Sequence, residues 1–229
     1  MPESHINQLN LYGQINDPRL EKIMLARIKV PEGLKDIIDI PMEDVLEYQA
    51  LEQEPVLLIP LKVPMENQKF MDDHKHYTKS NINVCYAAPR SMKKARNWYE
   101  TQMTIPRKVR NIEGYPNKGI PFFIVTDDGF GFLAHTTSDN NKQLAAVGDE
   151  LILGKWIKGR LVQEGLVTPT DDVSKDTNRN GMITKEMLEK YGCNALALQK
   201  TSERVISPEN DMNSYEVWTL KMVWSEESE

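Results

Sequence analysis

The chain has 229 residues, of which 40% are hydrophobic and 27% charged, and its 28 basic and 34 acidic side chains give a formal net charge of −6. A chain of this length buries a sizeable core without disulfides or metals, in one large or two small globular domains. It has no apolar run near 18 residues, no secretory signal pattern and only two cysteines, which excludes a transmembrane helix and a disulfide scaffold and indicates a cytoplasmic protein.

The first half of the chain is weakly patterned. Residues 18–30 have the apolar spacing of a helix, or of a helix that runs into a strand, and residues 43–54 are typical of a short acidic helix that ends before Pro55. Residues 56–63 are typical of a strand in which Pro60 indicates a sheet edge or a bulge. Charge changes sign near Pro89, so we predict a small α/β N-terminal region over 1–88 and a main domain over 89–229.

The second half predicts strands joined by tight turns. Residues 98–106 alternate as a strand, and residues 122–126 and 130–135 flank Asp127-Asp128-Gly129, which is typical of a hairpin turn. Residues 149–164 are typical of a helix that ends at Gly165, and a second short helix begins after Thr184 and ends at Gly192. Two more strands are expected at 194–200 and 215–224. This order predicts a mainly β fold of barrel type with two short helices, rather than a βαβ repeat.

Charge is distributed unevenly along the chain. Residues 1–88 hold nine Lys and Arg against fourteen Asp and Glu, whereas residues 89–110 hold seven basic side chains against Glu100 alone. Such a strip acts over about 10 Å in salt and is a usable footprint for an anionic partner. The alternative for this strip is a solvated basic loop.

Two further segments have side chains that suit nucleic acid. The loop at 136–143 concentrates hydroxyls, amides and a lysine, which contact bases and phosphates in DNA complexes. Lys155 and Lys158 lie three residues apart and share one face of the predicted helix at 149–164. The alternatives are a plain surface loop and an amphipathic helix packed on the barrel with a solvated basic side.

Metal sites receive little support from the sequence. Asp176 to Gly181 has the spacing that begins a calcium loop, but Met187 occupies the position that needs a bidentate carboxylate. His74 and His76 have no third ligand at a suitable spacing. We therefore predict no metal ligand, no catalytic residue and no cofactor, with magnesium expected only if the chain is itself a nuclease.

A series of ordered motifs resembles one known family. The segments RNWYETQMTIPRKV, GYP, PFFIVTDDGFGFLAHTTSDNNKQL, ILGKWIKGRLVQEGL, ITKEMLEKYG and ALALQKT, within residues 80–224, resemble the C-terminal part of NgoFVII-type restriction endonucleases. The resemblance implies an open seven-stranded β pseudobarrel of the plant B-three type. It also implies two arms that grip the major groove of double-stranded DNA, in a restriction–modification system that acts in phage defence.

Within this resemblance we assign a set of candidate DNA-binding residues. Basic side chains would neutralise phosphates and the polar loop would touch base edges. The candidates are Arg96, Arg107, Lys108, Arg110, Ser138, Asn140, Asn141, Lys142, Lys155 and Lys158.

The chain departs from the family at the nuclease. Family members carry a phospholipase D-type nuclease domain with an H-x-K signature, and this sequence has no H-x-K. The leading hypothesis is therefore a sequence-specific DNA-recognition subunit or domain. The alternatives are a metal-dependent endonuclease that uses Asp72, Asp73 and His74 or His76, and a scaffold in which residues 1–88 dock a nuclease or helicase partner.

Overall fold

A computed structural model describes residues 55–70, 80–89, 95–207 and 210–226, with only the backbone described for 205–207 and 210–213. The helices predicted at 18–30 and 43–54 and the cluster at Asp72, Asp73, His74 and His76 lie outside these residues. The structure therefore describes the part of the chain that carries most of the quoted motifs.

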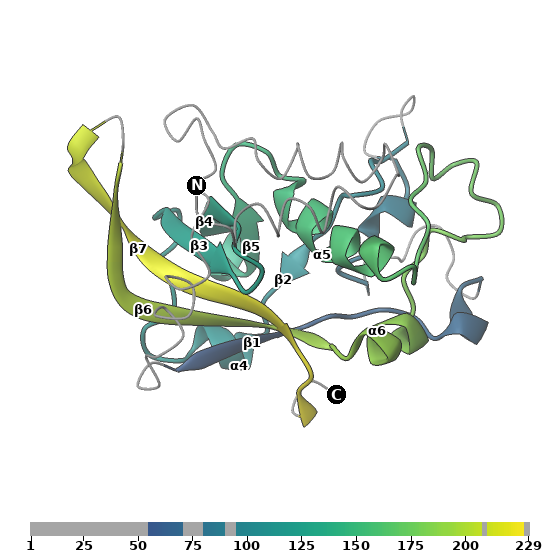
Figure 1. The fold of residues 1–229 in the computed structure, drawn as a ribbon, viewed down its shortest axis with the longest axis horizontal. Helices are drawn as coiled ribbons and strands as arrows, with labels where there is room; N and C mark the ends of the chain where they lie inside the picture. Colours follow the sequence, from purple (N-terminus) through teal and green to yellow (C-terminus); the bar gives the residue numbers. More distant parts are fainter. Residues whose placement is uncertain (1–54, 71–79, 90–94, 208–209, 227–229) are drawn as a thin grey trace, which may run out of the picture.

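Seven strands form one mixed sheet in the order β1-β6-β7-β3-β4-β5-β2 (Figure 1). All neighbouring pairs are antiparallel except β3 and β7, which run parallel. The strands are β1 (Val56–Pro60), β2 (Met103–Thr104), β3 (Phe122–Thr126), β4 (Gly131–Thr137), β5 (Gln143–Ala146), β6 (Ala195–Ser207) and β7 (Asn210–Val223). Three α-helices accompany them in the described residues: α4 (Arg107–Arg110), α5 (Ile152–Gln163) and α6 (Lys185–Tyr191).

The sheet curls until its two edge strands nearly meet, and Asn81 links them. Its side chain accepts a hydrogen bond from the Lys62 backbone N–H at 2.8 Å and donates one to the Pro60 carbonyl at 2.7 Å, at the end of β1. Its own carbonyl accepts the Gln102 N–H at 2.7 Å, just before β2. One buried asparagine therefore spans the seam of a nearly closed barrel, and the predicted seven-stranded pseudobarrel with few helices is confirmed.

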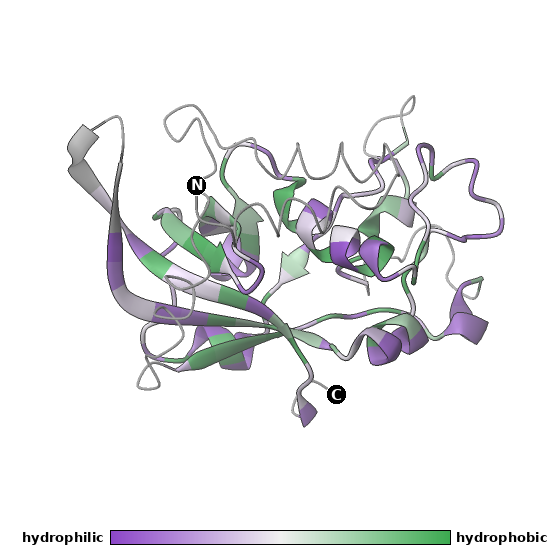
Figure 2. Ribbon diagram, viewed as in Figure 1, coloured by the Kyte–Doolittle hydropathy of each residue, from purple (hydrophilic) through white to green (hydrophobic). Residues whose placement is uncertain are grey.

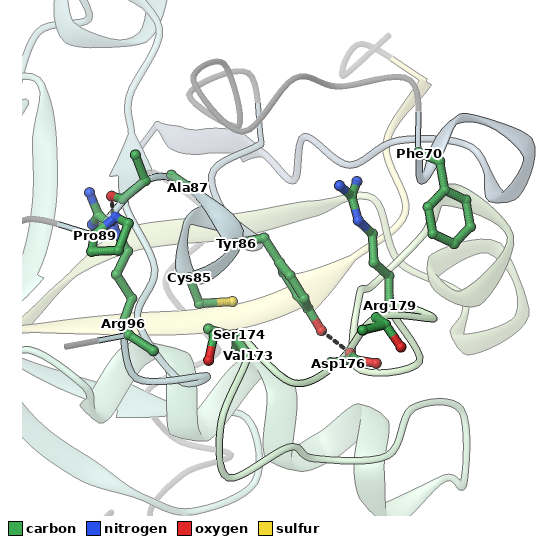
Figure 3. Close-up of a pocket in the computed structure, with 13 residues that line it drawn as sticks. Phe70, Cys85, Tyr86, Ala87, Pro89, Arg96, Val173, Ser174, Asp176 and Arg179 are labelled. Atoms are coloured by element: carbon green, nitrogen blue, oxygen red, sulfur yellow. Dashed lines mark hydrogen bonds between the residues drawn. The ribbon is translucent and has the colours of Figure 1, made fainter. Parts of the chain in front are cut away.

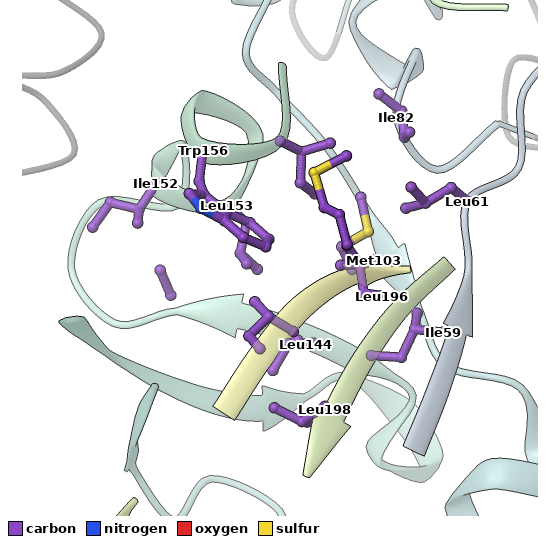
Figure 4. Packing of buried hydrophobic residues seen from close by; sticks show 14 of the residues in the cluster. Ile59, Leu61, Ile82, Met103, Leu144, Ile152, Leu153, Trp156, Leu196 and Leu198 are labelled. Carbon is purple, nitrogen blue, oxygen red and sulfur yellow. The ribbon is translucent and has the colours of Figure 1, made fainter. Parts of the chain in front are cut away.

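The core lies inside the barrel and under α5. Figure 4 shows Ile59, Met103, Leu144 and Leu198 from four strands in one cluster with Trp156 of α5. Hydrophobic residues gather on the central sheet in Figure 2, whereas β6 is hydrophilic where it extends beyond β1 and pairs with β7 alone. The burial of apolar surface between sheet and helix is the main driving force for this packing.

Turn chemistry explains where the predicted hairpin and second helix end. Gly129 has φ 81°, and the Thr126 N–H donates to the Phe130 carbonyl across the three-residue loop, which is a common hairpin with glycine in the left-handed region. Gly192 has φ 87° and ends α6, whose N-cap residue is Thr184. The expected hairpin, helix start and helix end are therefore confirmed.

Two predicted strands have different lengths in the structure. The strand expected at 98–106 is reduced to Met103–Thr104, because the Gln102 N–H is used by Asn81 and a short helix follows Pro106. The strands expected at 194–200 and 215–224 extend to Ser207 and back from Asn210 as a ribbon that continues past β1 and β3 (Figure 1).

The packed unit spans the predicted boundary at residues 88/89. β1 pairs with β6 over Val56–Pro60, and Ile82 and Cys85 belong to the same hydrophobic core as residues of α5. Asn83 exchanges two hydrogen bonds with the backbone of Ile183, at 2.7 and 3.0 Å. The barrel therefore uses residues from both sides of that boundary.

Candidate nucleic-acid interface

Two segments about thirty residues apart meet at one end of the barrel. They are α4 and the 3₁₀ turn η4 (Asp139–Asn141), which connects β4 to β5. Arg110 donates from Nη1 to the Asn140 carbonyl at 2.6 Å, and the Ile105 N–H donates to the Lys142 carbonyl at 2.7 Å. The fold therefore joins the basic strip and the polar loop, which are separate segments in the sequence.

The stretch that follows α4 completes this junction. The Tyr115 hydroxyl donates to the Asn141 carbonyl at 2.7 Å, and Asn141 Nδ2 donates to the Pro116 carbonyl at 2.7 Å. Burial raises the pKa of Tyr115 to about 12, so its hydroxyl remains a neutral donor at physiological pH. Lys118 pairs with Thr136 of β4 in an isolated parallel bridge. Three connected segments therefore present one continuous surface.

This surface is rich in positive charge. We name it the basic face and define it by its five cations. The same segments carry two carboxylates, those of Glu113 and Asp139. Arg107, Lys108 and Lys118 are exposed, whereas Arg110 and Lys142 are half-buried. The cations of the basic face are Arg107, Lys108, Arg110, Lys118 and Lys142.

The turn η4 has an unusual backbone. Ser138, Asn140 and Asn141 have φ values of 72°, 56° and 56°, in the left-handed region. Asparagine tolerates this region better than most residues, which explains the Asn140-Asn141 pair. Asn140 is exposed at the tip, whereas Ser138 and Asn141 are half-buried at its sides.

Two polar atoms inside the junction have no hydrogen-bond partner among the described residues. They are Arg110 Nε and Asn141 Oδ1, both buried. An unpartnered buried polar atom costs about 1–3 kcal/mol, so the junction between α4 and η4 leaves two polar groups unsatisfied.

Two of the predicted contacts on α5 are contradicted by burial. Lys158 is fully buried and donates to the Trp98 carbonyl, and its Nζ lies 3.5 Å from Cys85 Sγ. Lys155 is 8% exposed, and its Nζ is paired with Asp149 Oδ2 at 2.6 Å. The predicted helix is present, but its basic side faces the protein, because α5 packs between the barrel and the 98–101 segment rather than on the surface.

Arg96 is also held by internal partners. Its Nη1 lies 2.6 Å from Glu100 Oε1, and its Nε donates to the Ala88 carbonyl at 3.1 Å. It lines a cavity of about 600 Å³ rather than the basic face, and it stays an untested prediction. Of the predicted residues, the structure therefore brings together Arg107, Lys108, Arg110 and the residues of the 138–142 turn.

Lys118 is a member of the basic face that sequence reasoning missed. It lies outside the 89–110 strip, in the turn Pro116-Asn117-Lys118-Gly119. The exposed Ile120 follows it, with 60% of its surface accessible. Only the pairing of this turn with β4 shows that it belongs with α4 and η4.

The calcium-like loop uses its carboxylate internally (Figure 3). Asp176 accepts a hydrogen bond from the Tyr86 hydroxyl at 2.5 Å and from the N–H groups of Asn180 and Gly181 at 2.8 and 2.9 Å. No group of three His, Cys, Asp or Glu residues in the described ranges could hold a metal ion. In the same ranges, no helix is long and apolar enough to span a membrane.

Comparison with known proteins identifies the family. A family model described as the NgoFVII C-terminal B3-like DNA-binding domain matches residues 55–191, which begin at β1 and end with α6. The chain matches no curated protein at a significant level. The match includes the seam, the basic face and helix α5, and it covers more than half of the sequence. The chain therefore belongs to the family of NgoFVII C-terminal B3-like DNA-binding domains.

Proposed function

We propose that this chain recognises a specific sequence in double-stranded DNA and is the recognition part of a type II restriction system. One observation carries the proposal: the hydrogen-bonded junction of α4 and η4 places the cations of the basic face beside the polar turn 138–142. Phosphate contacts by Arg and Lys position a protein on DNA, and amide or hydroxyl contacts to base edges give it specificity.

The residues divide between these two roles. Arg107, Lys108 and Lys118 are exposed and would neutralise phosphates on the DNA backbone. Asn140 lies exposed at the tip of η4, and Asn makes bidentate contacts to adenine. Arg110 has its Nη1 on the Asn140 carbonyl and therefore supports the turn.

In this proposal a partner chain, and not this one, cleaves the DNA. The sequence lacks the H-x-K signature of the phospholipase D-type nuclease, so the usual nucleophile of that chemistry is absent from it. A nuclease or helicase subunit would act at the site that this chain marks.

The test is selection of bound duplexes from a random pool by the purified full chain. We expect enrichment of one short motif, with affinity for it at least about a thousandfold above that for random duplex. Magnesium is added to half of the samples, so that cutting by the chain alone would reveal the nuclease alternative. Failure to retain any duplex, or retention without a motif, would overturn sequence-specific recognition.

A further inference from the structure

A groove opens beside η4, on the outer side of β4 and β5. It has a volume of about 510 Å³, and the core residues Leu144 and Leu153 are among its apolar lining residues. Its polar lining residues come from three segments of the chain. They are Thr101, Gln102, His135, Thr137, Ser138, Gln143 and Glu150.

The groove exists because β2 leaves β5 early. Met103 and Thr104 pair with Leu144 and Gln143. The preceding residue, Gln102, donates its N–H to the Asn81 carbonyl instead of pairing with β5. The 101–102 segment is therefore released from β5 to close the barrel seam. Because this segment moves away from β5, the groove opens beside Ala145.

Strand alternation sets the side chains that face the groove. In β4, Thr136 is buried whereas His135 and Thr137 are half-buried. In β5, Leu144 is buried whereas Gln143 and Ala145 are half-buried. The register places Gln143 opposite Thr137, and Ala145, which contributes only a methyl group, opposite His135. A column of polar groups thus lines one wall of an open space.

The groove continues the basic face. Ser138 lines the groove and begins the η4 turn, and Gln143 directly follows Lys142. The chemistry nevertheless changes at this point, because no Lys or Arg lines the groove and Glu150 does. A carboxylate repels phosphate, whereas amides, hydroxyls and a carboxylate match the donors and acceptors of base edges.

We propose that this groove reads base edges of the bound duplex, with Gln143 as the central contact and Thr137 and His135 beside it. The inference rests on the proposed DNA recognition and adds a second reading surface to the η4 turn. Within the described part of the chain, the side chains of Gln143 and Thr137 make no hydrogen bond, so both are free for a base. Glutamine offers adenine a donor and an acceptor at once, and threonine offers a hydroxyl and a methyl.

The experiment compares four proteins in selection of bound duplexes from the same random pool. They are the full chain and its variants Gln143→Ala, Ala145→Leu and Gln163→Ala. Gln143→Ala removes the central contact and Ala145→Leu fills the hollow, whereas Gln163→Ala removes the same side chain at the far end of α5. Thermal melting confirms that each variant is folded.

We expect Gln143→Ala to lose the preference at one base pair of the motif, with about tenfold weaker binding to the original site and unchanged binding to random duplex. Ala145→Leu should weaken binding to the motif in the same way, and Gln163→Ala should match the parent chain. A Gln143→Ala variant that keeps the whole motif and its affinity would overturn the groove inference and leave DNA recognition intact. A parent chain that enriches no motif would overturn both.

Discussion

Lys158 carries an ionisable amine into the core, where it donates to the Trp98 carbonyl and lies over the Trp98 ring at 4.9 Å from its centroid. Its environment favours the neutral amine, because burial lowers the pKa of Lys158 below its ordinary 10.5. Burial likewise raises the pKa of the neighbouring Cys85 thiol above 9.0. Burial therefore disfavours the charged form of both side chains.

A pH-dependent stability follows for Lys158. Between its lowered pKa and 10.5 the unfolded chain binds more protons than the folded chain, so the free energy of unfolding rises with pH through this window. Relative to Lys158→Met, the protein with Lys158 should therefore gain stability as the pH rises from 7 to 10. Urea unfolding at both pH values measures the gain.

The comparison should be made in a Cys85→Ala background, because burial also raises the pKa of that thiol above 9.0 and so adds its own pH dependence to stability. Lys155→Met is the matched control, because Lys155 forms an ion pair with Asp149, which lies just before the start of α5. Parallel pH curves for the protein with Lys158 and its Lys158→Met variant would contradict the argument that burial controls this amine.

At the scale of elements, the seam of the barrel depends on a side chain rather than on a strand pair. Asn81→Ala leaves the Lys62 N–H and the Pro60 carbonyl without their partner. An unsatisfied buried group costs about 1–3 kcal/mol, and these two groups are only part-buried, so we expect a total loss of about 1–3 kcal/mol in the free energy of unfolding. Chemical denaturation measures it.

Asn178→Ala is the matched control for the seam, because Asn178 is exposed in the 168–181 connection, which lies between α5 and α6. It should stay within about 0.5 kcal/mol of the parent chain. If Asn81→Ala were equally neutral, closure of the barrel would have to rest on the core alone.

Helix α5 makes a second contact that a single methyl group tests. A Cβ at Gly154 would lie 1.7 Å from the Tyr99 carbonyl oxygen, a backbone atom that cannot move aside cheaply. Gly→Ala inside a helix ordinarily stabilises by about 1 kcal/mol. Gly154→Ala should have the opposite sign and lower the thermal midpoint, while Gln163→Ala in the same helix should leave it unchanged. A higher midpoint for Gly154→Ala would show that α5 does not approach the 98–101 segment so closely.

Elements that depend on local chemistry could be predicted from the sequence, as the hairpin at Asp127-Asp128-Gly129 and the end of α6 at Gly192 show. Features that depend on distant partners could not. The length of β2 depends on Asn81, and the direction of Lys158 depends on the 98–101 segment. Helical spacing alone does not show that α5 is buried on all sides.

At the scale of the whole molecule, the net charge of −6 is a poor guide to the partner, because the charges are segregated. The sequence predicted one basic strip, but it could not show that Lys118 and Lys142 join Arg107 and Lys108 on one face. That arrangement depends on the hydrogen bonds of Arg110, Tyr115 and Asn141. A local field of this kind acts within about one Debye length, so distant acidic side chains do not cancel it.

This arrangement predicts how affinity for duplex DNA depends on salt. Each phosphate that a Lys or Arg neutralises adds about 0.9 to the slope of log affinity against log salt. Arg107→Gln removes an exposed cation of the basic face, so the slope should fall by about one while the preferred sequence stays the same. Lys175→Gln is the control, because Lys175 is 84% exposed but lies on the 168–181 connection, at the opposite end of the molecule from α4 in Figure 1. Titration of binding between about 50 and 200 mM salt measures these slopes. An unchanged slope for Arg107→Gln, or an equal fall in slope for Lys175→Gln, would show that the basic face does not hold the DNA backbone.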